Sequence, residues 1–264
     1  MITIGADPEL FLSDNSGKLI PACGLIGGTK RHPTPMEREG FYIQEDNVAV
    51  EFNIPPASNV LDFLDSIQWS LDEIMRRVAI LKMAVKPVSV HQFSDDDLKH
   101  PQARTFGCEP DFNAWNKGDR NPKIIPTIAG NMRTCGGHGH IGYPEKDDNN
   151  FRIRLIQACD WTLGVPSIIM DRESIERRRL YGQAGCFRPT TYGVEYRVLS
   201  NFWLKSRELT QWFYNGLVKA YELAKHSSMS KLLDQEGQHI QNMINHDLTI
   251  DAKHFIEKYN IACV

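Results

Sequence analysis

Polar and apolar positions combine in an unusual way at four places along the chain. Each place carries two polar side chains two residues apart, inside a run of apolar residues that is typical of a strand. Residues i and i+2 of a strand point to the same face of a sheet, and the apolar neighbours predict burial on both faces. Buried carboxylates and imidazoles are costly unless they are paired or bind a cation. The pattern therefore predicts one sheet with a cation-binding face, and its four pairs are Asp7 with Glu9, Glu51 with Asn53, His138 with His140, and Glu195 with Arg197.

The same alternation and the helical periodicity elsewhere predict the elements of the chain. The expected strands span residues 2–4, 9–12, 18–22, 48–54, 88–92, 138–143 and 194–200. The expected helices span residues 58–83 with Ser58 as N-cap, then 149–163, 172–180, 207–226, 228–246 and 251–259. A turn at residues 14–17 joins two strands as a hairpin, which implies antiparallel pairing.

Strands and helices mix without a strict βαβ alternation, and this predicts an α+β fold with helices packed on one face of an antiparallel sheet. The 264 residues are enough to bury a full core, and no linker or repeat interrupts them. We therefore expect one domain over residues 1–264, with a helical part over about residues 207–264.

Composition narrows the function classes only a little. The chain is 41% hydrophobic and 24% charged, with a formal net charge of −3, so it has no broad positive surface for nucleic acid or anionic membranes. A local basic groove stays compatible with these numbers. Six cysteines without paired spacing and the lack of a secretory signal predict reduced thiols in the cytoplasm. The longest apolar run, around residues 163–170, is too short to cross a bilayer.

Each polar pair also has an ordinary interpretation. Asp7 precedes a proline, as turn aspartates do, Glu51 could sit on a solvated strand face, and a single histidine is more often structural than a ligand. Two histidines framed by glycines are harder to explain in this way, because glycine lets a ligand or another chain approach closely. Carboxylates without a majority of histidines favour Mg²⁺ or Mn²⁺ over zinc.

A basic segment follows the histidine pair. Arginines 177–179 precede a loop with Gly182 and Gly185, and the loop leads to Arg188 beside the strand of Glu195 and Arg197. A run of arginines on a helix is usually a solvated face, but an arginine beside a metal site can hold a phosphoryl group. The chain has neither a GxxxxGK[ST] nor a GxGxxG motif, and residues 27–30 (GGTK) are too short for one. A nucleotide would have to be held by metals and arginines.

Four motifs in order, GADPE, QEDNVAVEFNIPP, GGHGHIGY and RLYGQAGCFRPTTYGVEYRVLSNFW, give the chain a family resemblance. Over about residues 1–205 the chain resembles the type 2 carboxylate–amine ligases of phiEco32-like phages, within the glutamine synthetase and glutamate–cysteine ligase superfamily. The resemblance implies a fold like the catalytic domain of glutamine synthetase, a curved antiparallel sheet with helices on its convex face. It also implies ATP-dependent joining of a carboxylate to an amine with Mg²⁺ or Mn²⁺, through an acyl phosphate, with release of ADP and phosphate.

The resemblance assigns expected roles to individual positions. The metal ligands would be Glu9, Glu51, His138, His140 and Glu195, with Asp7 and Asp46 as further or supporting ligands. ATP and the acyl phosphate would meet Arg188 and Arg197, which would also act in catalysis. Beyond the resemblance, we also expect Arg179 and Lys30 to contact the cofactor. The base for the incoming amine would be Asp46 or Glu109.

Several alternatives stay open at this stage. A guanidino-kinase-like phosphotransferase would use similar arginines, and a metal-dependent hydrolase or nuclease would use the same carboxylates and histidines. A binding protein on a degenerate ligase scaffold is a further alternative. The first strand begins at residue 2, which leaves no room for the N-terminal portion that completes the site of glutamine synthetase, so oligomeric state and amine site are open. We expect small-molecule or peptide substrates and, for a phage protein, a location in the host cytoplasm.

Overall fold

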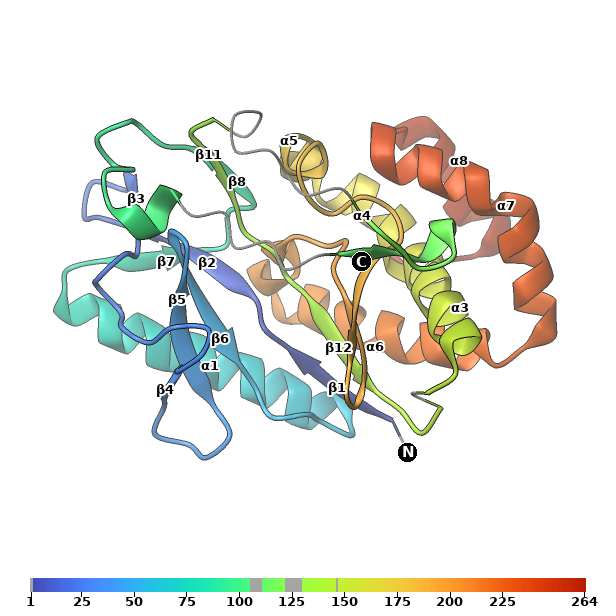
Figure 1. Cartoon of the computed structure of the whole chain (residues 1–264), viewed down its shortest axis with the longest axis horizontal. Helices are drawn as coiled ribbons and strands as arrows, with labels where there is room; N and C mark the ends of the chain where they lie inside the picture. The colour runs from blue at the N-terminus through green and yellow to red at the C-terminus, as the bar shows by residue number, and fades with distance from the viewer. Residues whose placement is uncertain (1, 105–110, 122–129, 146) are drawn as a thin grey trace.

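The computed structural model describes residues 2–104, 111–121, 130–145 and 147–264. Strands from the first 60 residues lie side by side with strands from residues 139–196 in its centre (Figure 1). One sheet has the strand order β1-β12-β14-β13-β9-β10, and a second has the order β3-β2-β6-β5-β4, with β7 also pairing β2. A short ribbon pairs β8 with β11. The pairings between these strands are antiparallel.

The bounds of the strands agree with most of the predicted ones. They are β1 Thr3–Ala6, β2 Glu9–Ser13, β3 Leu19–Ile20, β4 Thr34–Pro35, β5 Tyr42–Asp46, β6 Ala49–Asn53, β7 Ala84–Lys86, β8 Val90–Gln92, β9 Phe112–Asn113, β10 Asp119–Arg120, β11 Met132–Thr134, β12 Gly139–Gly142, β13 Cys186–Thr190 and β14 Gly193–Tyr196. The sequence did not predict β4, β5, β7, β9, β10 or β11, and it assigned β13 to a glycine-rich loop. These strands are short, and β4 and β13 contain a proline, which weakens the strand signal.

The two six-stranded sheets continue into each other along the N-terminal segment. Ile4 pairs with Ala57 through two backbone hydrogen bonds of 2.8 Å, and the N–H of Ile54 donates to Ala6 O at 3.3 Å. After Pro8, β2 takes over the pairing with β6. The α+β class and the curved antiparallel sheet are therefore confirmed.

The helices follow the predicted order with shifted ends. They are α1 Val60–Ile80, α3 Asn149–Cys159, α4 Val165–Met170, α5 Ile175–Arg178, α6 Arg207–Ala224, α7 Ser227–His246 and α8 Thr249–Tyr259. Short 3-10 turns are η1 Pro101–Arg104, η2 Ala114–Asn116, η4 Arg172–Ser174 and η5 Asn201–Lys205, and η3 Asp160–Gly164 is a π-helical turn between α3 and α4. The predicted N-cap of the first helix was wrong by one residue: Asn59, in extended conformation, accepts a hydrogen bond from the N–H of Asp62 at 3.0 Å.

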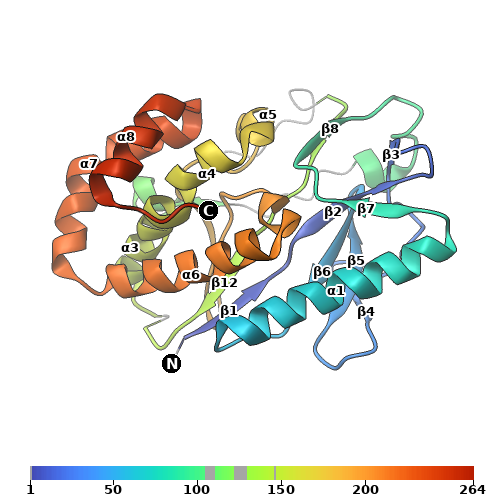
Figure 2. The same ribbon diagram turned by 180° about the vertical axis from the view of Figure 1, so that it is seen from behind.

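Helices α1 and α6 lie behind the sheet, as Figure 2 shows from that side. The contact is close at β12, because a Cβ atom on Gly139 would lie 2.7 Å from Leu217 Cδ1 and 2.9 Å from Phe213 Cζ of α6. Phe213 in turn stacks on Trp203 with ring centroids 4.1 Å apart. This apolar packing occupies one face of the sheet and leaves the polar positions of the strands to the other.

The carboxylate of Asp160, in the π-helical turn, connects the helices with the strands. It is fully buried and accepts hydrogen bonds from Trp115 Nε1 at 2.6 Å, Gly185 N at 2.7 Å and the Tyr196 hydroxyl at 2.8 Å. Burial raises the pKa of Asp160 to about 7, although the three donors oppose that shift. Tyr196 lies on β14 and Gly185 directly precedes β13, so this one side chain fixes the position of the β13–β14 hairpin.

Within the described residues, no helix is long and apolar enough to cross a membrane.

Replacing Asp160 by alanine should lower the free energy of unfolding by about 3 kcal/mol or more, because it leaves buried donors without an acceptor. Asp160→Asn keeps an amide oxygen as acceptor and should cost about 1–2 kcal/mol. Urea denaturation monitored by circular dichroism measures both. Asp234→Ala, at an exposed position of α7, is the control and should stay within about 0.5 kcal/mol of the wild type. Equal stabilities for Asp160→Ala and the control would contradict this role.

Candidate active site

Strand register brings the polar residues of distant segments together on the free face of the sheet. Glu9 of β2 lies directly opposite Glu51 of β6. On the other side, Glu195 of β14 lies between two neighbours, opposite His140 of β12 and opposite Arg188 of β13. Residues directly opposite each other on adjacent strands share a face, with Cβ atoms about 5 Å apart. These side chains therefore form two adjacent groups on the same face of the sheet.

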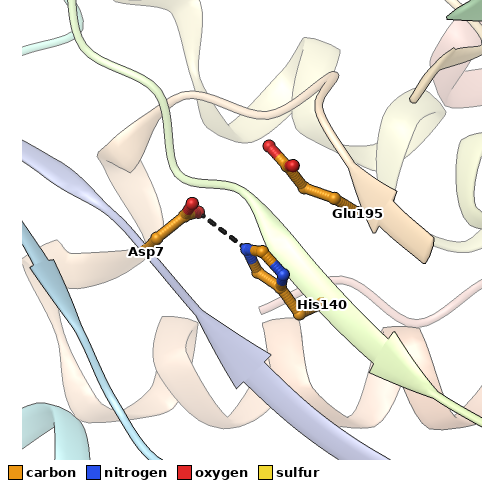
Figure 3. A group of neighbouring side chains, drawn as sticks. All are labelled: Asp7, His140 and Glu195. Atoms are coloured by element: carbon orange, nitrogen blue, oxygen red, sulfur yellow. Dashed lines mark ion pairs between the residues drawn. The ribbon is translucent and has the colours of Figure 1, made fainter. Parts of the chain in front are cut away.

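The first group consists of Asp7, His140 and Glu195 (Figure 3). One ligand atom from each of them lies within 4.8 Å of the others. His140 Nε2 and Asp7 Oδ1 are 3.1 Å apart. These two atoms and Glu195 Oε1 are buried, and they form ion pairs but no contact with hydrogen-bond geometry. Buried and convergent oxygen and imidazole atoms fit a divalent cation such as Mg²⁺ or Mn²⁺.

His138 contacts both carboxylates of this first group. Its Nδ1 lies 3.3 Å from Glu195 Oε1 and 3.6 Å from Asp7 Oδ1. Burial alone would lower the pKa of His138, but the two carboxylates outweigh it and raise that pKa to about 10. The pKa of Asp7 is lowered: burial opposes this, and the charges of His140 and His138 prevail.

The second group consists of Glu9, Asp46 and Glu51, which also converge within 4.8 Å. Burial, and then the charge of Asp46, raise the pKa of Glu9 to about 7. Burial and the neighbouring carboxylates raise the pKa of Glu51 well above its ordinary value. Lys30 offsets part of this negative charge, with Nζ 3.4 Å from Asp46 Oδ2. Three carboxylates around one lysine form a second location that suits a cation.

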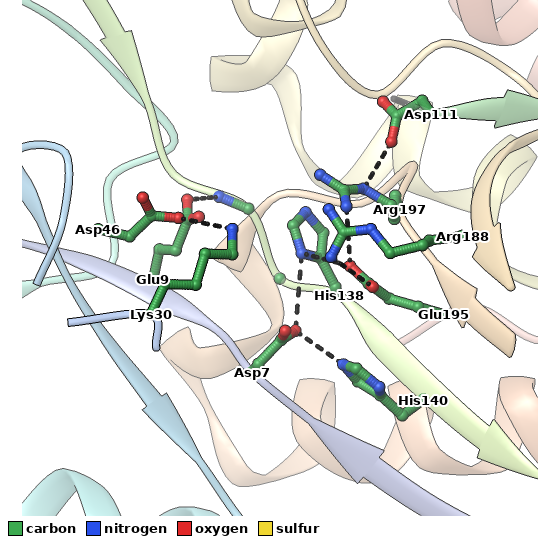
Figure 4. Close-up of polar contacts among 12 residues, drawn as sticks. Asp7, Glu9, Lys30, Asp46, Asp111, His138, His140, Arg188, Glu195 and Arg197 are labelled. Atoms are coloured by element: carbon green, nitrogen blue, oxygen red, sulfur yellow. Dashed lines mark hydrogen bonds and ion pairs between the residues drawn. The ribbon is translucent and has the colours of Figure 1, made fainter. Parts of the chain in front are cut away.

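Arginines from the β13–β14 hairpin surround Glu195 (Figure 4). Arg188 Nη1 lies 3.1 Å from Glu195 Oε2, and Arg197 Nη1 lies 3.2 Å from Glu195 Oε1. Arg197 Nε also pairs with Asp111 Oδ1 at 2.8 Å. Nε and Nη2 of Arg188 are buried and form no hydrogen bond. Guanidinium donors without partners next to a candidate metal group are suited to binding phosphate oxygens.

One cavity connects both groups and the arginines. The predicted residues that line it are Asp7, Glu9, Lys30, Asp46, Glu51, His138, Arg188, Glu195 and Arg197. His140 is not among the lining residues, and it is connected to the cavity through Asp7, whose Oδ1 lies 3.1 Å from His140 Nε2. Arg179 is not brought there, because its side chain is exposed and pairs with Glu176 at 2.9 Å. Asn53, which the sequence paired with Glu51, is absent from the lining of the cavity. Glu109 lies outside the described residues.

The structure brings in charged residues to which the sequence assigned no role of their own, among them Arg177 and Asp111. Arg177 lines the cavity, and Asp111 pairs with the lining residue Arg197. Burial raises the pKa of Asp111 to about 6, while His138 and Arg188 oppose the shift. The only sequence signal for Asp111 was its place before Phe112 in an irregular stretch, and Arg177 could not be distinguished from its two arginine neighbours.

The pairing of Asp7 with Glu9 also differs from the simple strand picture. β1 ends at Ala6 and β2 begins at Glu9, with Pro8 between them. Asp7 consequently joins the group of His140 and Glu195, whereas Glu9 joins the group of Glu51 and Asp46. Asp7 and Glu9 therefore line the same cavity, as their spacing predicted, but they belong to two different candidate cation sites.

Comparison with known proteins supports the class that the motifs indicate. The family model described as phage phiEco32-like COOH.NH2 ligase-type 2 matches residues 123–246, which include the histidine and arginine motifs. The predicted resemblance to these carboxylate–amine ligases is thus confirmed over that stretch. A solved chain described as a novel glutamine synthase homolog aligns with 98% of this chain, at 10% identity and a TM-score of 0.40. The present chain spans 66% of that chain's length. The search of curated proteins found no match.

Mn²⁺ should stabilise the protein against heat, because it would bind the folded carboxylate groups. An ion at about 100 times its dissociation constant contributes about 2.7 kcal/mol. Glu195→Gln and Glu51→Gln should each remove part of the shift in melting temperature, and the double variant should remove it. Glu257→Gln on α8, far from the cavity in sequence and exposed, is the control. A full Mn²⁺ shift in the double variant would argue against cation binding at both groups.

Proposed function

We propose that this chain is an ATP-dependent ligase that joins a carboxylate to an amine. The observation that carries the proposal is the convergence of two metal-competent carboxylate groups and two arginines in one cavity. The family match over residues 123–246 supports the ligase class. ATP, the divalent metal and the acyl phosphate are parts of the proposal that the resemblance implies.

The residues present fit a divalent cation at either group. Asp7, His140 and Glu195 would hold one ion, and Glu9, Asp46 and Glu51 would hold another. A cation in the second group would also remove the cost of keeping three carboxylates close together, which is visible as the raised pKa of Glu51. When bound, Mg²⁺ or Mn²⁺ would offset negative charge on a transferring phosphoryl group.

The chain's own residues would position the phosphates and move the proton. Arg188 would hold phosphoryl oxygens with its Nε and Nη2, which form no hydrogen bond, and Arg197 and Lys30 would add two further positive charges in the same cavity. Such positioned charges account for most of the catalysis in phosphoryl transfer. Asp46 is the proposed base, because its carboxylate reaches the cavity and is also partly open to solvent.

The proposed reaction has two steps. The substrate carboxylate attacks the γ-phosphorus of ATP, the bond to the leaving ADP breaks, and an acyl phosphate forms. The amine nitrogen then attacks the acyl carbon, phosphate leaves, and the proton lost by nitrogen passes to Asp46. Activation by ATP is needed because phosphate is a far better leaving group than oxide.

Hydroxylamine distinguishes this reaction from its rivals. With ATP, Mg²⁺ and a panel of carboxylic acids, the ligase should release ADP and form a hydroxamate of the accepted acid, which mass spectrometry detects. A phosphotransferase would instead give a stable phosphorylated product, and a hydrolase would act without ATP. ADP release that is stimulated by an amine, with no hydroxamate from any acid, would overturn the acyl phosphate.

Glu195→Gln and His140→Ala should each reduce ADP release by a factor of 100 or more, on the scale of removing one electrostatic contributor to a transition state. Their circular dichroism spectra and melting curves should stay close to those of the wild type. Glu257→Gln serves as the matched carboxylate-to-amide control and should retain full ADP release. Retained ADP release in a folded Glu195→Gln variant would contradict the assignment of Glu195 to the active site.

A further inference from the structure

The three consecutive arginines at the end of α5 lie in three different environments. Arg179 is exposed and pairs with Glu176, and Arg178 is buried and pairs with Asp247 at 3.2 Å. Arg177 is only 2% exposed and lines the cavity of the candidate active site. Successive residues of a helix point roughly 100° apart, so only one residue of this run can face the cavity.

The charge of Arg177 is poorly compensated within the described part of the chain. Its Nη1 donates to Val198 O at 2.8 Å, while its Nε is buried and forms no hydrogen bond. No ion pair joins Arg177 to a carboxylate among the described residues, in contrast to Arg188 and Arg197. A buried charge without a paired counter-charge is costly. An anion bound in the cavity would remove this cost.

The loop after α5 is built around this guanidinium. A Cβ atom on Gly182 would lie 2.2 Å from Arg177 Nη1 and 2.4 Å from Val198 O. Gly182 also has a φ of +79°, which other residues rarely adopt. The first glycine of the YGQAG loop is therefore required by the buried position of Arg177 as well as by the turn.

We propose that Arg177 binds a carboxylate group of the acid substrate, a role that rests on the proposed ligase function. Arg188 and Arg197 form ion pairs with Glu195 of the first candidate metal group, where phosphates would lie, whereas among the described residues no ion pair joins Arg177 to that group. Leu180 and Tyr181, one turn after Arg177, line the same cavity and offer apolar surface to a carbon chain. A planar guanidinium matches a carboxylate with two parallel hydrogen bonds. The chemistry at this end suits an organic acid better than a polyphosphate.

The test compares two kinds of ligand, carboxylic acids and a nucleotide, on the full-length protein by isothermal titration calorimetry. Succinate, acetate and glutamate probe the carboxylate subsite, and the analogue AMP-PNP with Mg²⁺ probes the phosphate region. Arg177→Gln keeps a donor for Val198 O but removes the charge. It should weaken binding of the best carboxylate probe at least about ten-fold, as expected for one charge-assisted hydrogen bond. AMP-PNP binding should change less than about two-fold, far less than such a bond contributes.

Arg172→Gln, at an exposed position before α5, is the matched control and should bind both ligands like the wild type. Weaker AMP-PNP binding with unchanged carboxylate binding in Arg177→Gln would make the residue a phosphate contact and overturn the proposal. Equal carboxylate binding by the two variants would assign Arg177 a purely structural role. A wild type that binds AMP-PNP but none of the three acids would also overturn it. Loss of ADP release in the wild type, by contrast, would count against the ligase function and not against an anion subsite.

Discussion

The buried carboxylate of Glu195 is the interaction on which the site depends. It is 2% exposed and lies within 3.3 Å of cationic or imidazole nitrogens of three residues, His138, Arg188 and Arg197. Such a carboxylate is tolerated only because these partners compensate its charge. The same partners are thereby held together beside the first candidate metal group. Because Glu195 is buried, it needs these charged partners, and its ion pairs with them fix the positions of His138, Arg188 and Arg197.

The two halves of the cavity differ in charge, and this difference explains why the cavity suits both cations and anions. The wall formed by β2, β5 and β6 places three carboxylates around Lys30, which leaves an excess of negative charge. The wall formed by the β13–β14 hairpin and α5 carries Arg188, Arg197 and Arg177. Phosphoryl transfer needs positive charge around the phosphate and metals to bridge it, and the two walls together provide groups for both.

The back of the sheet supports this arrangement through apolar packing and one polar anchor. Helix α6 packs tightly on β12 at Gly139, which fixes the strand that carries His140. Asp160 holds Tyr196, and thereby the strand position between Glu195 and Arg197. Because three segments share this one acceptor, a change behind the sheet would shift the arginines in front of it. We therefore expect the stability of the fold and the positions of these arginines to be coupled through that carboxylate.

The sequence predicted the strands that carry the polar pairs and most of the helices, because the alternation of apolar residues indicates which positions face a core. It did not predict the short strands in the irregular and glycine-rich segments. It also identified nearly all carboxylates and histidines of the cavity, since such residues are rare inside apolar strands. It could not show that Asp7 and Glu9 belong to two different candidate cation sites. The reason is that the strand is interrupted around Pro8: β1 before it pairs with β12, and β2 after it pairs with β6. Nor could it decide which arginine of residues 177–179 enters the cavity, because this depends on the rotation of a four-residue helix and on the space left by Gly182. Only the tertiary structure fixes the orientation of these charges, because it is set by contacts between segments far apart in the chain.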